Sequence, residues 1–152
     1  MWNFDNIEKF ENIDNTDIKV GDKVAKLKSL NFYGSYLPCF EILEVSRITP
    51  KRTRIYYKER DYADDFQLYN QFYLVTDELE KFSEENKLRY FLFKRIERYA
   101  SYVIDRKKLG YTDDSTLFKT IENYAINSPI ENIREDMNCF YKIDNIIKGI
   151  KC

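Results

Sequence analysis

Histidine is absent from this chain of 152 residues, which also has only 3 cysteines, 4 glycines and 3 prolines. Without histidine, the chain lacks the side chain that most often acts as a general acid or base, or as a metal ligand, near neutral pH. The cysteines are odd in number and far apart, so they fit neither a disulfide framework nor a paired-cysteine metal site. The glycines form no phosphate-binding loop. We therefore expect no enzymatic activity, no metal and no cofactor.

Long apolar runs and a signal-peptide pattern are also missing, so we expect no membrane partner and a location in the cytoplasm. The formal net charge is −1, so no overall field selects nucleic acid or a membrane surface. Aromatic residues are plentiful, with 13 Tyr, 11 Phe and 1 Trp. Tyrosine suits surfaces that are apolar on one side and wet on the other. Because the sequence shows no catalytic signature, we expect this chain to function by binding a partner through its surface.

The spacing of apolar residues changes along the chain and predicts an α+β fold. A short amphipathic helix or turn is expected within residues 1–15. Alternating apolar residues and turn signals after it predict a small, strongly bent antiparallel sheet that resembles a β-barrel. Thr76 suits the N-cap of one long helix over residues 76–108, with residues 99–101 as the likeliest break. The apolar face of this helix is wide enough to pack on two sides.

The remainder of the chain predicts a C-terminal helical hairpin packed on the long helix. Its two helices are expected at about 115–126 and 129–149. Ser128, Pro129 and Glu131 fit an N-cap, a first helical residue and a capping box. We therefore expect an N-terminal domain over residues 1–75, with the barrel-like sheet, and a helical region over residues 76–152.

Charged residues alternate in blocks of opposite sign. Residues 47–60 hold six basic residues and one acidic residue, residues 61–85 hold eight acidic and one basic, and residues 87–108 hold eight basic and two acidic. Such blocks either pair with one another inside the fold or gather on a binding surface. Both interpretations are open at this stage.

Two surfaces are candidates for binding a partner. The first is a basic hairpin whose tyrosine lies among cations, a combination that suits phosphate contact and base stacking. Its candidates are Arg47, Lys51, Arg52, Arg54, Tyr56, Lys58 and Arg60. The second is acidic and consists of Asp61, Asp64 and Asp65 with the first turn of the long helix, because clustered carboxylates can occupy a basic groove that is meant for nucleic acid. The aromatic residues Phe32, Tyr33 and Tyr36 are further contact candidates that would act together with one of the charged surfaces.

Three segments together resemble a known group of proteins. They are residues 19–24 (KVGDKV), 48–55 (ITPKRTRI) and 72–79 (FYLVTDEL). Over residues 18–98 the chain is similar to small, SH3-like β-barrel proteins encoded by bacteriophages and prophages, in which a few strands run into a helix that begins at threonine. The resemblance implies a phage or prophage accessory protein that works in the cytoplasm of a bacterial host cell.

The expected function is therefore non-enzymatic binding of a host protein. Its concrete form is inhibition of a defence nuclease or nucleoprotein effector, as in anti-CRISPR proteins, by steric or electrostatic blocking. A nucleic-acid-binding module that uses the 47–60 hairpin is the alternative. A homodimer joined through the long helix, whose surplus apolar surface would form the interface, is a third.

Overall fold

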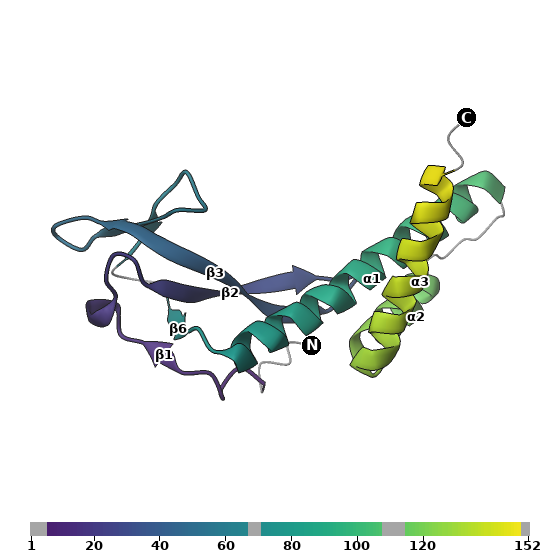
Figure 1. Ribbon diagram of the computed structural model, residues 1–152. Coiled ribbons are helices and arrows are strands. Elements are labelled where there is room, and N and C mark those ends of the chain that lie inside the picture. The colour runs from purple at the N-terminus through teal and green to yellow at the C-terminus, as the bar shows by residue number, and fades with distance from the viewer. Residues whose placement is uncertain (1–5, 67–70, 108–114, 150–152) are drawn as a thin grey trace. The chain divides into compact units, whose positions relative to one another are not determined.

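The computed structural model describes residues 6–66, 71–107 and 115–149, where strands precede helices, and this confirms the predicted α+β class (Figure 1). The strands are β1 (Asn12–Ile13), β2 (Lys23–Asn31), β3 (Tyr36–Ile48), β4 (Arg54–Tyr57), β5 (Asp64–Asp65) and β6 (Phe72–Leu74). A short 3-10 helix, η1 (Asn15–Asp17), follows β1. The helices are α1 (Asp77–Lys107), α2 (Ser115–Asn127) and α3 (Ile130–Gly149).

The chain divides into two compact units, which are described separately. The sheet unit contains residues 3–29 and 38–84, and the helical unit contains residues 30–37 and 85–152. The sequence predicted a boundary between residues 75 and 76. In the structure, the first turns of α1 belong to the sheet unit, and the tip of the β2–β3 hairpin belongs to the helical unit.

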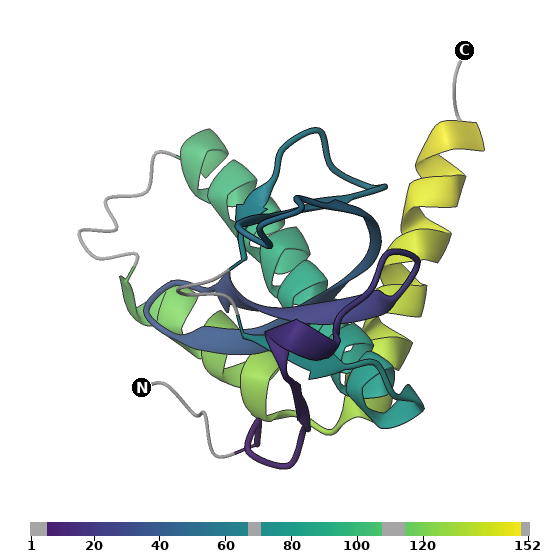
Figure 2. The same ribbon diagram turned by 90° about the vertical axis from the view of Figure 1, so that its left-hand side faces the viewer.

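The strands form one antiparallel sheet in the order β1-β6-β2-β3-β4-β5. Its register shifts between Val45 and Arg47 of β3, and such an irregularity bends a strand. Gly21, in the turn before β2, has a φ of 94°, a conformation that glycine adopts without steric cost. The Gly21 N–H donates to the Val45 carbonyl at 2.8 Å, so this turn is fastened to β3. Figure 2 shows the curl of the strands.

Two apolar clusters form the core of the sheet unit. One is enclosed by the curled sheet and consists of Ile18, Val24, Leu43, Val45, Ile55, Tyr57, Phe66 and Phe72. The other lies where the first turns of α1 meet the sheet, and consists of Ile7, Phe10, Ala25, Phe40, Tyr73 and Leu79. Burying a large apolar side chain of this kind stabilises a fold by about 1.5–3 kcal/mol.

The curled sheet does not close into a barrel, because the order of the strands leaves β1 and β5 as edges of the described sheet. Side chains next to these edges bridge the opening instead. The Asn15 side chain donates to the Phe66 carbonyl at 2.8 Å. The Arg52 guanidinium donates to the carbonyls of Asn15 and Ile18, the latter at 3.0 Å. Edge strands this short offer little backbone for unwanted pairing.

The described part of the segment before β1, residues 6–10, is a turn, which is one of the two alternatives that the sequence allowed for residues 1–15. The Phe10 N–H donates to the Ile7 carbonyl at 2.9 Å, and both side chains are buried in the sheet unit. The sequence analysis did not predict β1 or η1, which follow this turn.

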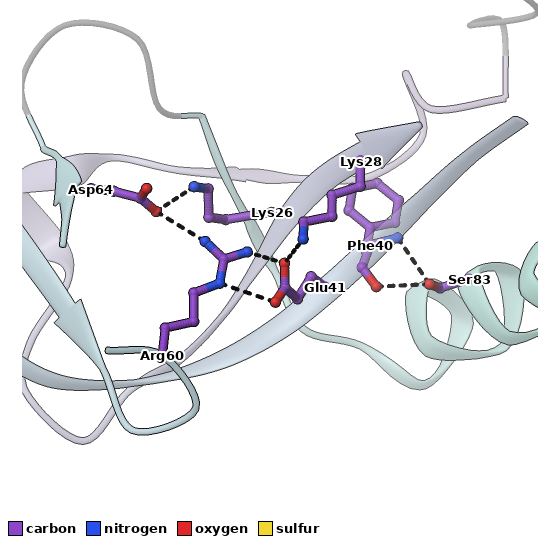
Figure 3. Close-up of polar contacts among 7 residues, drawn as sticks. All are labelled: Lys26, Lys28, Phe40, Glu41, Arg60, Asp64 and Ser83. Atoms are coloured by element: carbon purple, nitrogen blue, oxygen red, sulfur yellow. Dashed lines mark hydrogen bonds and ion pairs between the residues drawn. The ribbon is translucent and has the colours of Figure 1, made fainter. Parts of the chain in front are cut away.

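Helix α1 begins where the sequence predicted. The Leu79 N–H donates to the Thr76 hydroxyl at 3.2 Å, and the Glu80 N–H donates to the Thr76 carbonyl at 2.9 Å. The buried Ser83 hydroxyl accepts the Phe40 N–H and donates to the Phe40 carbonyl, both at 2.9 Å, and so fastens the helix to β3 (Figure 3). The sequence left open whether the helix breaks at residues 99–101, and the structure shows it continuous to Lys107.

In the helical unit, α1 packs on two sides, as its wide apolar face predicted. Phe93 and Ile96 pack against Ile121 and Ala125 of α2. Leu92, with Ile96 again, packs on a different side against residues of α3 that include Ile133, Met137 and Phe140. The predicted helical hairpin is therefore present, and α3 begins one residue later than predicted, at Ile130. The Pro129 carbonyl accepts the Asn132 N–H at 3.0 Å.

Candidate functional site

Arg60 lies at the centre of a charged cluster in the sheet unit, which we call the ion-pair network: Lys26, Lys28, Glu41, Arg60 and Asp64 (Figure 3). Its guanidinium contacts both Glu41 oxygens, with Nε 3.1 Å from Oε1, and lies 3.6 Å from Asp64. Lys26 binds Asp64, and Lys28 binds Glu41. The Arg60 side chain is 9% exposed, so its charge is neutralised mainly by its partners.

The sheet brings these residues together from positions far apart in the chain. Lys26 and Lys28 lie on one face of β2, because side chains alternate along a strand. Glu41 comes from the neighbouring strand β3, Arg60 follows β4, and Asp64 begins β5. The network therefore depends on the register of four strands, which no local sequence pattern encodes.

The network shifts the pKa of Glu41, Asp64 and Arg60 away from neutrality. Burial alone would raise the pKa of Glu41 and Asp64, but hydrogen bonds and charges from the neighbouring cations outweigh it and lower both pKa values. Burial, followed by the interaction with Asp64, raises the pKa of Tyr57. Burial would lower the pKa of Arg60, but the contact with Glu41 raises it. None of these shifts moves a group toward neutral pH, where a general acid or base works best.

Three cations of the basic hairpin bind other parts of the sheet unit. Arg60 belongs to the ion-pair network, and Lys58, whose side chain is 60% exposed, pairs with Glu44 at 2.5 Å. Arg52 binds main-chain carbonyls and lies 4.8 Å from the centre of the Phe66 ring. Of these contacts, the one between Arg60 and Asp64 joins the basic block 47–60 to the acidic block 61–85, whereas Glu41 and Glu44 lie outside the blocks. Both interpretations that the sequence left open therefore apply to part of this hairpin.

The other candidates of the basic hairpin lie nearer the surface. Arg47, Lys51 and Arg54 are exposed, and Tyr56 is half-buried. The Arg47 guanidinium lies 4.0 Å from the centre of the Tyr56 ring, and these two residues are partners in the β3–β4 ladder. A cation over an aromatic face can stack on a base or on another ring. This half of the hairpin keeps the features expected of a binding surface.

The acidic candidates do not form one cluster. Asp64 is 17% exposed and is neutralised in the ion-pair network. Asp61 and Asp65 are exposed, and Asp65 lies opposite Arg54 in the β4–β5 ladder. Asp61, Asp64 and Asp65 therefore do not form a single acidic surface.

The aromatic loop, residues 31–36, connects β2 and β3 and belongs to the helical unit. Phe32 is 9% exposed, and its ring centre lies 5.0 Å from that of Phe93, so Phe32 is a core residue rather than a contact residue. Tyr33 and Tyr36 are 46% and 37% exposed. Two of the three aromatic candidates in this loop therefore reach the surface.

Glu122 of α2 holds the aromatic loop in place. Its side chain is among the buried polar groups, and its carboxylate accepts the Gly34 N–H at 2.6 Å and the Ser35 hydroxyl at 2.7 Å. The Tyr33 ring packs against Phe118 of α2, with ring centres 5.5 Å apart. A loop that is already ordered loses less conformational entropy when it binds a partner.

The sequence analysis did not identify Glu122 as important, although a signal was present. Glu122 lies four residues after Phe118 and three before Ala125, so it falls on the apolar face of α2. A carboxylate on such a face needs a partner when it is buried. The partner is backbone of a loop almost ninety positions earlier, at a separation of 88 residues for Gly34.

Within the described part of the chain, no group of three or more carboxylates or cysteines is placed to hold a metal ion. The same ranges contain no helix long and apolar enough to cross a membrane. No protein-family model, curated protein or solved structure matches this chain. The similarity to phage-encoded β-barrel proteins therefore stays a prediction.

Proposed function

We propose that this chain is a non-enzymatic binding protein that contacts a partner protein through the aromatic loop. The supporting observation is that Tyr33 and Tyr36 are exposed on a loop that Glu122 and the buried Phe32 hold in place. Tyrosine is enriched at protein–protein interfaces, and a preformed loop presents it at low entropic cost. The phage-like resemblance makes a host defence nuclease, such as a CRISPR effector, the concrete target, which would be blocked sterically.

Affinity capture from a bacterial lysate, with mass spectrometry, tests this function. We expect the tagged wild-type chain to enrich a host protein and the Tyr33→Ala/Tyr36→Ala double variant to lose it. Tyrosines that act as interface hot spots contribute about 2 kcal/mol each, which is more than tenfold in affinity. Tyr62→Ala is the matched control, because Tyr62 is 59% exposed and lies outside the loop.

Two results would contradict the proposal. One is capture of the same partners by the wild type and the double variant, because the loop would then not be the contact. The other is hydrolysis of a nucleotide or nucleic acid by the purified chain, because the chain would then be an enzyme. If a nuclease is captured, adding the purified chain should reduce its cleavage rate, and the double variant should not.

Nucleic-acid binding is the second candidate function, and the contact between Arg47 and Tyr56 favours it. Binding of a single-stranded oligonucleotide should weaken as salt increases, because each phosphate contact releases counterions. Arg47→Ala and Arg54→Ala should each weaken binding and reduce the salt dependence. Arg52 is unsuitable for this test because it supports the fold. Binding that is insensitive to salt and to both substitutions would exclude this function for the hairpin.

A further inference from the structure

A groove in the helical unit combines apolar and basic side chains, and we call it the aromatic–basic groove. It lies between α1 and α3, has a volume of about 300 Å³, and is lined by Phe91, Lys94, Arg95, Arg98, Met137 and Tyr141. The four residues from α1 follow the spacing i, i+3, i+4 and i+7, so they form one stripe along the helix. The two from α3 are four positions apart and form a second stripe.

The apolar part of the groove has a buried floor and exposed walls. Met137 is 4% exposed, whereas Phe91 and Tyr141 are 54% and 52% exposed. Isolated exposed apolar residues are normal on a protein surface, but here two large rings line one groove with a methionine. A methionine thioether adapts its shape to different apolar side chains. The groove is therefore suited to receiving apolar side chains from outside.

The basic part of the groove differs from the ion-pair network. None of the residues that line the groove is acidic. The nearest described carboxylate contact of Lys94 is Glu97 at 3.4 Å, between side chains that are 44% and 30% exposed. An ion pair at this exposure contributes less than about 1 kcal/mol and is easily exchanged for another. Arg98 is exposed as well. The groove therefore presents positive charge beside apolar surface.

We propose that the aromatic–basic groove binds an amphipathic helical segment of a partner protein whose acidic residues flank its apolar ones. Two side-chain stripes along neighbouring helices match the way an amphipathic helix lies in a groove. The apolar residues of such a segment would contact Phe91, Met137 and Tyr141, and its carboxylates would face the exposed Lys94 and Arg98. This surface is separate from the aromatic loop, so the inference goes beyond the proposed function.

A single-stranded nucleic acid fits this groove less well than an acidic helix. Affinity for nucleic acid comes mostly from cations that follow the phosphate backbone along its length. Here three cations lie on one helical stripe, and the opposite stripe is a methionine and a tyrosine. An acidic amphipathic helix, in contrast, offers carboxylates to the cations of one stripe and apolar side chains to the methionine and tyrosine of the other.

Binding of a peptide panel by the full chain tests this inference. The probes are fluorescent amphipathic peptides of about 18 residues, long enough to form a helix, with leucine on one face and glutamate on the flanks in several registers. In matched control peptides every glutamate is replaced by lysine. We expect glutamate peptides to bind, as measured by fluorescence anisotropy, and affinity to decrease with salt. The lysine peptides should not bind.

Substitutions in the chain locate the binding. Arg98→Glu and Phe91→Ala should each weaken the best glutamate peptide by about tenfold or more, which is the effect of losing about 1.4 kcal/mol. Lys119→Glu and Leu117→Ala are the matched controls, because both residues are exposed on α2 outside the groove. Circular dichroism and thermal unfolding should show that all four variants are folded.

Four results would overturn the inference. They are binding of no glutamate peptide, equal binding of the lysine peptides, binding unaffected by both groove substitutions, and an oligonucleotide that binds here in preference to the peptides. Light scattering adds a further outcome. A dimer of the wild type that Arg98→Glu dissociates would show that a second copy of this chain, rather than a different protein, occupies the groove.

Discussion

Two segments rich in basic residues, 47–60 in the sheet unit and 87–108 in the helical unit, place some of their cations in different surroundings. In the sheet unit, Arg60 contacts two carboxylates, and its side chain is 9% exposed. In the helical unit, Lys94 and Arg98 are exposed and line a groove without acidic residues. Both segments have a similar excess of basic residues in the sequence. The contacts that a basic residue makes therefore depend on where the fold places carboxylates, and a count of charges along the sequence does not give this.

Aromatic residues show the same contrast. Phe40, Phe66 and Phe72 are fully buried in the sheet unit. Most of the exposed large apolar side chains among the described residues lie in the helical unit, at Tyr33, Tyr36, Phe91, Tyr99, Leu117, Tyr124, Tyr141 and Ile143. The sheet unit exposes Val20, Tyr62 and Leu74. Exposed aromatic surface beside cations is what an interface needs. The two surfaces that we propose for partner proteins, the aromatic loop and the aromatic–basic groove, therefore both lie in the helical unit.

The largest expected effect is the loss of stability when Arg60 is replaced. Arg60→Met leaves Glu41 and Asp64 without their shared cation, and we expect the free energy of unfolding to fall by about 3 kcal/mol in urea titrations. Arg98→Met, in the helical unit, should change it by less than about 0.5 kcal/mol, as for most surface substitutions. Equal effects of the two substitutions would remove the contrast between the units.

A triple variant shows whether the charges themselves are responsible. Arg60→Met combined with Glu41→Gln and Asp64→Asn removes the unpaired carboxylates, so part of the lost stability should return. If the triple variant is as unstable as the sum of the single ones, packing around Arg60 explains the loss and the network is not its cause.

The next effect concerns the aromatic loop. Glu122→Ala removes the acceptor for the Gly34 N–H and the Ser35 hydroxyl, and should lower the free energy of unfolding by about 2 kcal/mol. Hydrogen exchange at the Gly34 amide should become faster by more than the global loss of stability explains. Lys119→Ala, on the same helix, is the control. Unchanged protection at Gly34 would show that Glu122 does not order the loop.

A smaller effect is the difference in stability loss between substitutions of two nearby arginines of the basic hairpin, Arg52 and Arg54. Arg52→Ala removes hydrogen bonds to two carbonyls that bridge the open side of the sheet, and should lower the free energy of unfolding by about 1–2 kcal/mol. Arg54→Ala, at an exposed position, should change it by less than about 0.5 kcal/mol. Thermal and chemical unfolding of both variants measure the difference. A reversed order would mean that Arg52 is a surface cation after all.

The smallest effect is the pH dependence that the ion-pair network produces. The pKa values of Glu41 and Asp64 lie below their ordinary values of 4.5 and 3.8 in the folded chain. The folded state therefore binds these protons less readily than the unfolded state, and the stabilisation is complete above the ordinary values. It should be lost as pH falls through the folded pKa values. Urea titrations of the Glu41→Gln/Asp64→Asn variant should show a flatter acid limb than those of the wild type.

Much of the fold could be predicted because its signals are local. Thr76 and the uninterrupted spacing after it predicted α1, and alternation with turn signals predicted a bent antiparallel sheet before it. The two-residue strands β1 and β5 were missed, since so short a segment carries no periodic pattern. The prediction of a bent, barrel-like sheet was confirmed. Whether its edge strands β1 and β5 pair with each other depends on contacts between distant segments, which local patterns do not show.

The candidate site could be predicted only in part. The aromatic loop was identified from its composition, yet burial decided that Phe32 belongs to the core while Tyr33 and Tyr36 do not. The aromatic–basic groove went unrecognised because its stripes come from α1 and α3, 39 or more positions apart between Arg98 and Met137. Helical spacing shows that residues share a face, but not which neighbouring helix that face meets.

The sequence by itself determined the α+β class, the beginning of α1 and the lack of histidine chemistry, because these follow from composition and from spacing within a few residues. The tertiary structure alone decided which charges stay available. Lys26 meets Asp64 through the register of the strands, at a separation of 38 residues, and Glu122 meets the aromatic loop through the packing of α2. Electrostatic pairing depends on distance in space, and only the folded chain sets that distance.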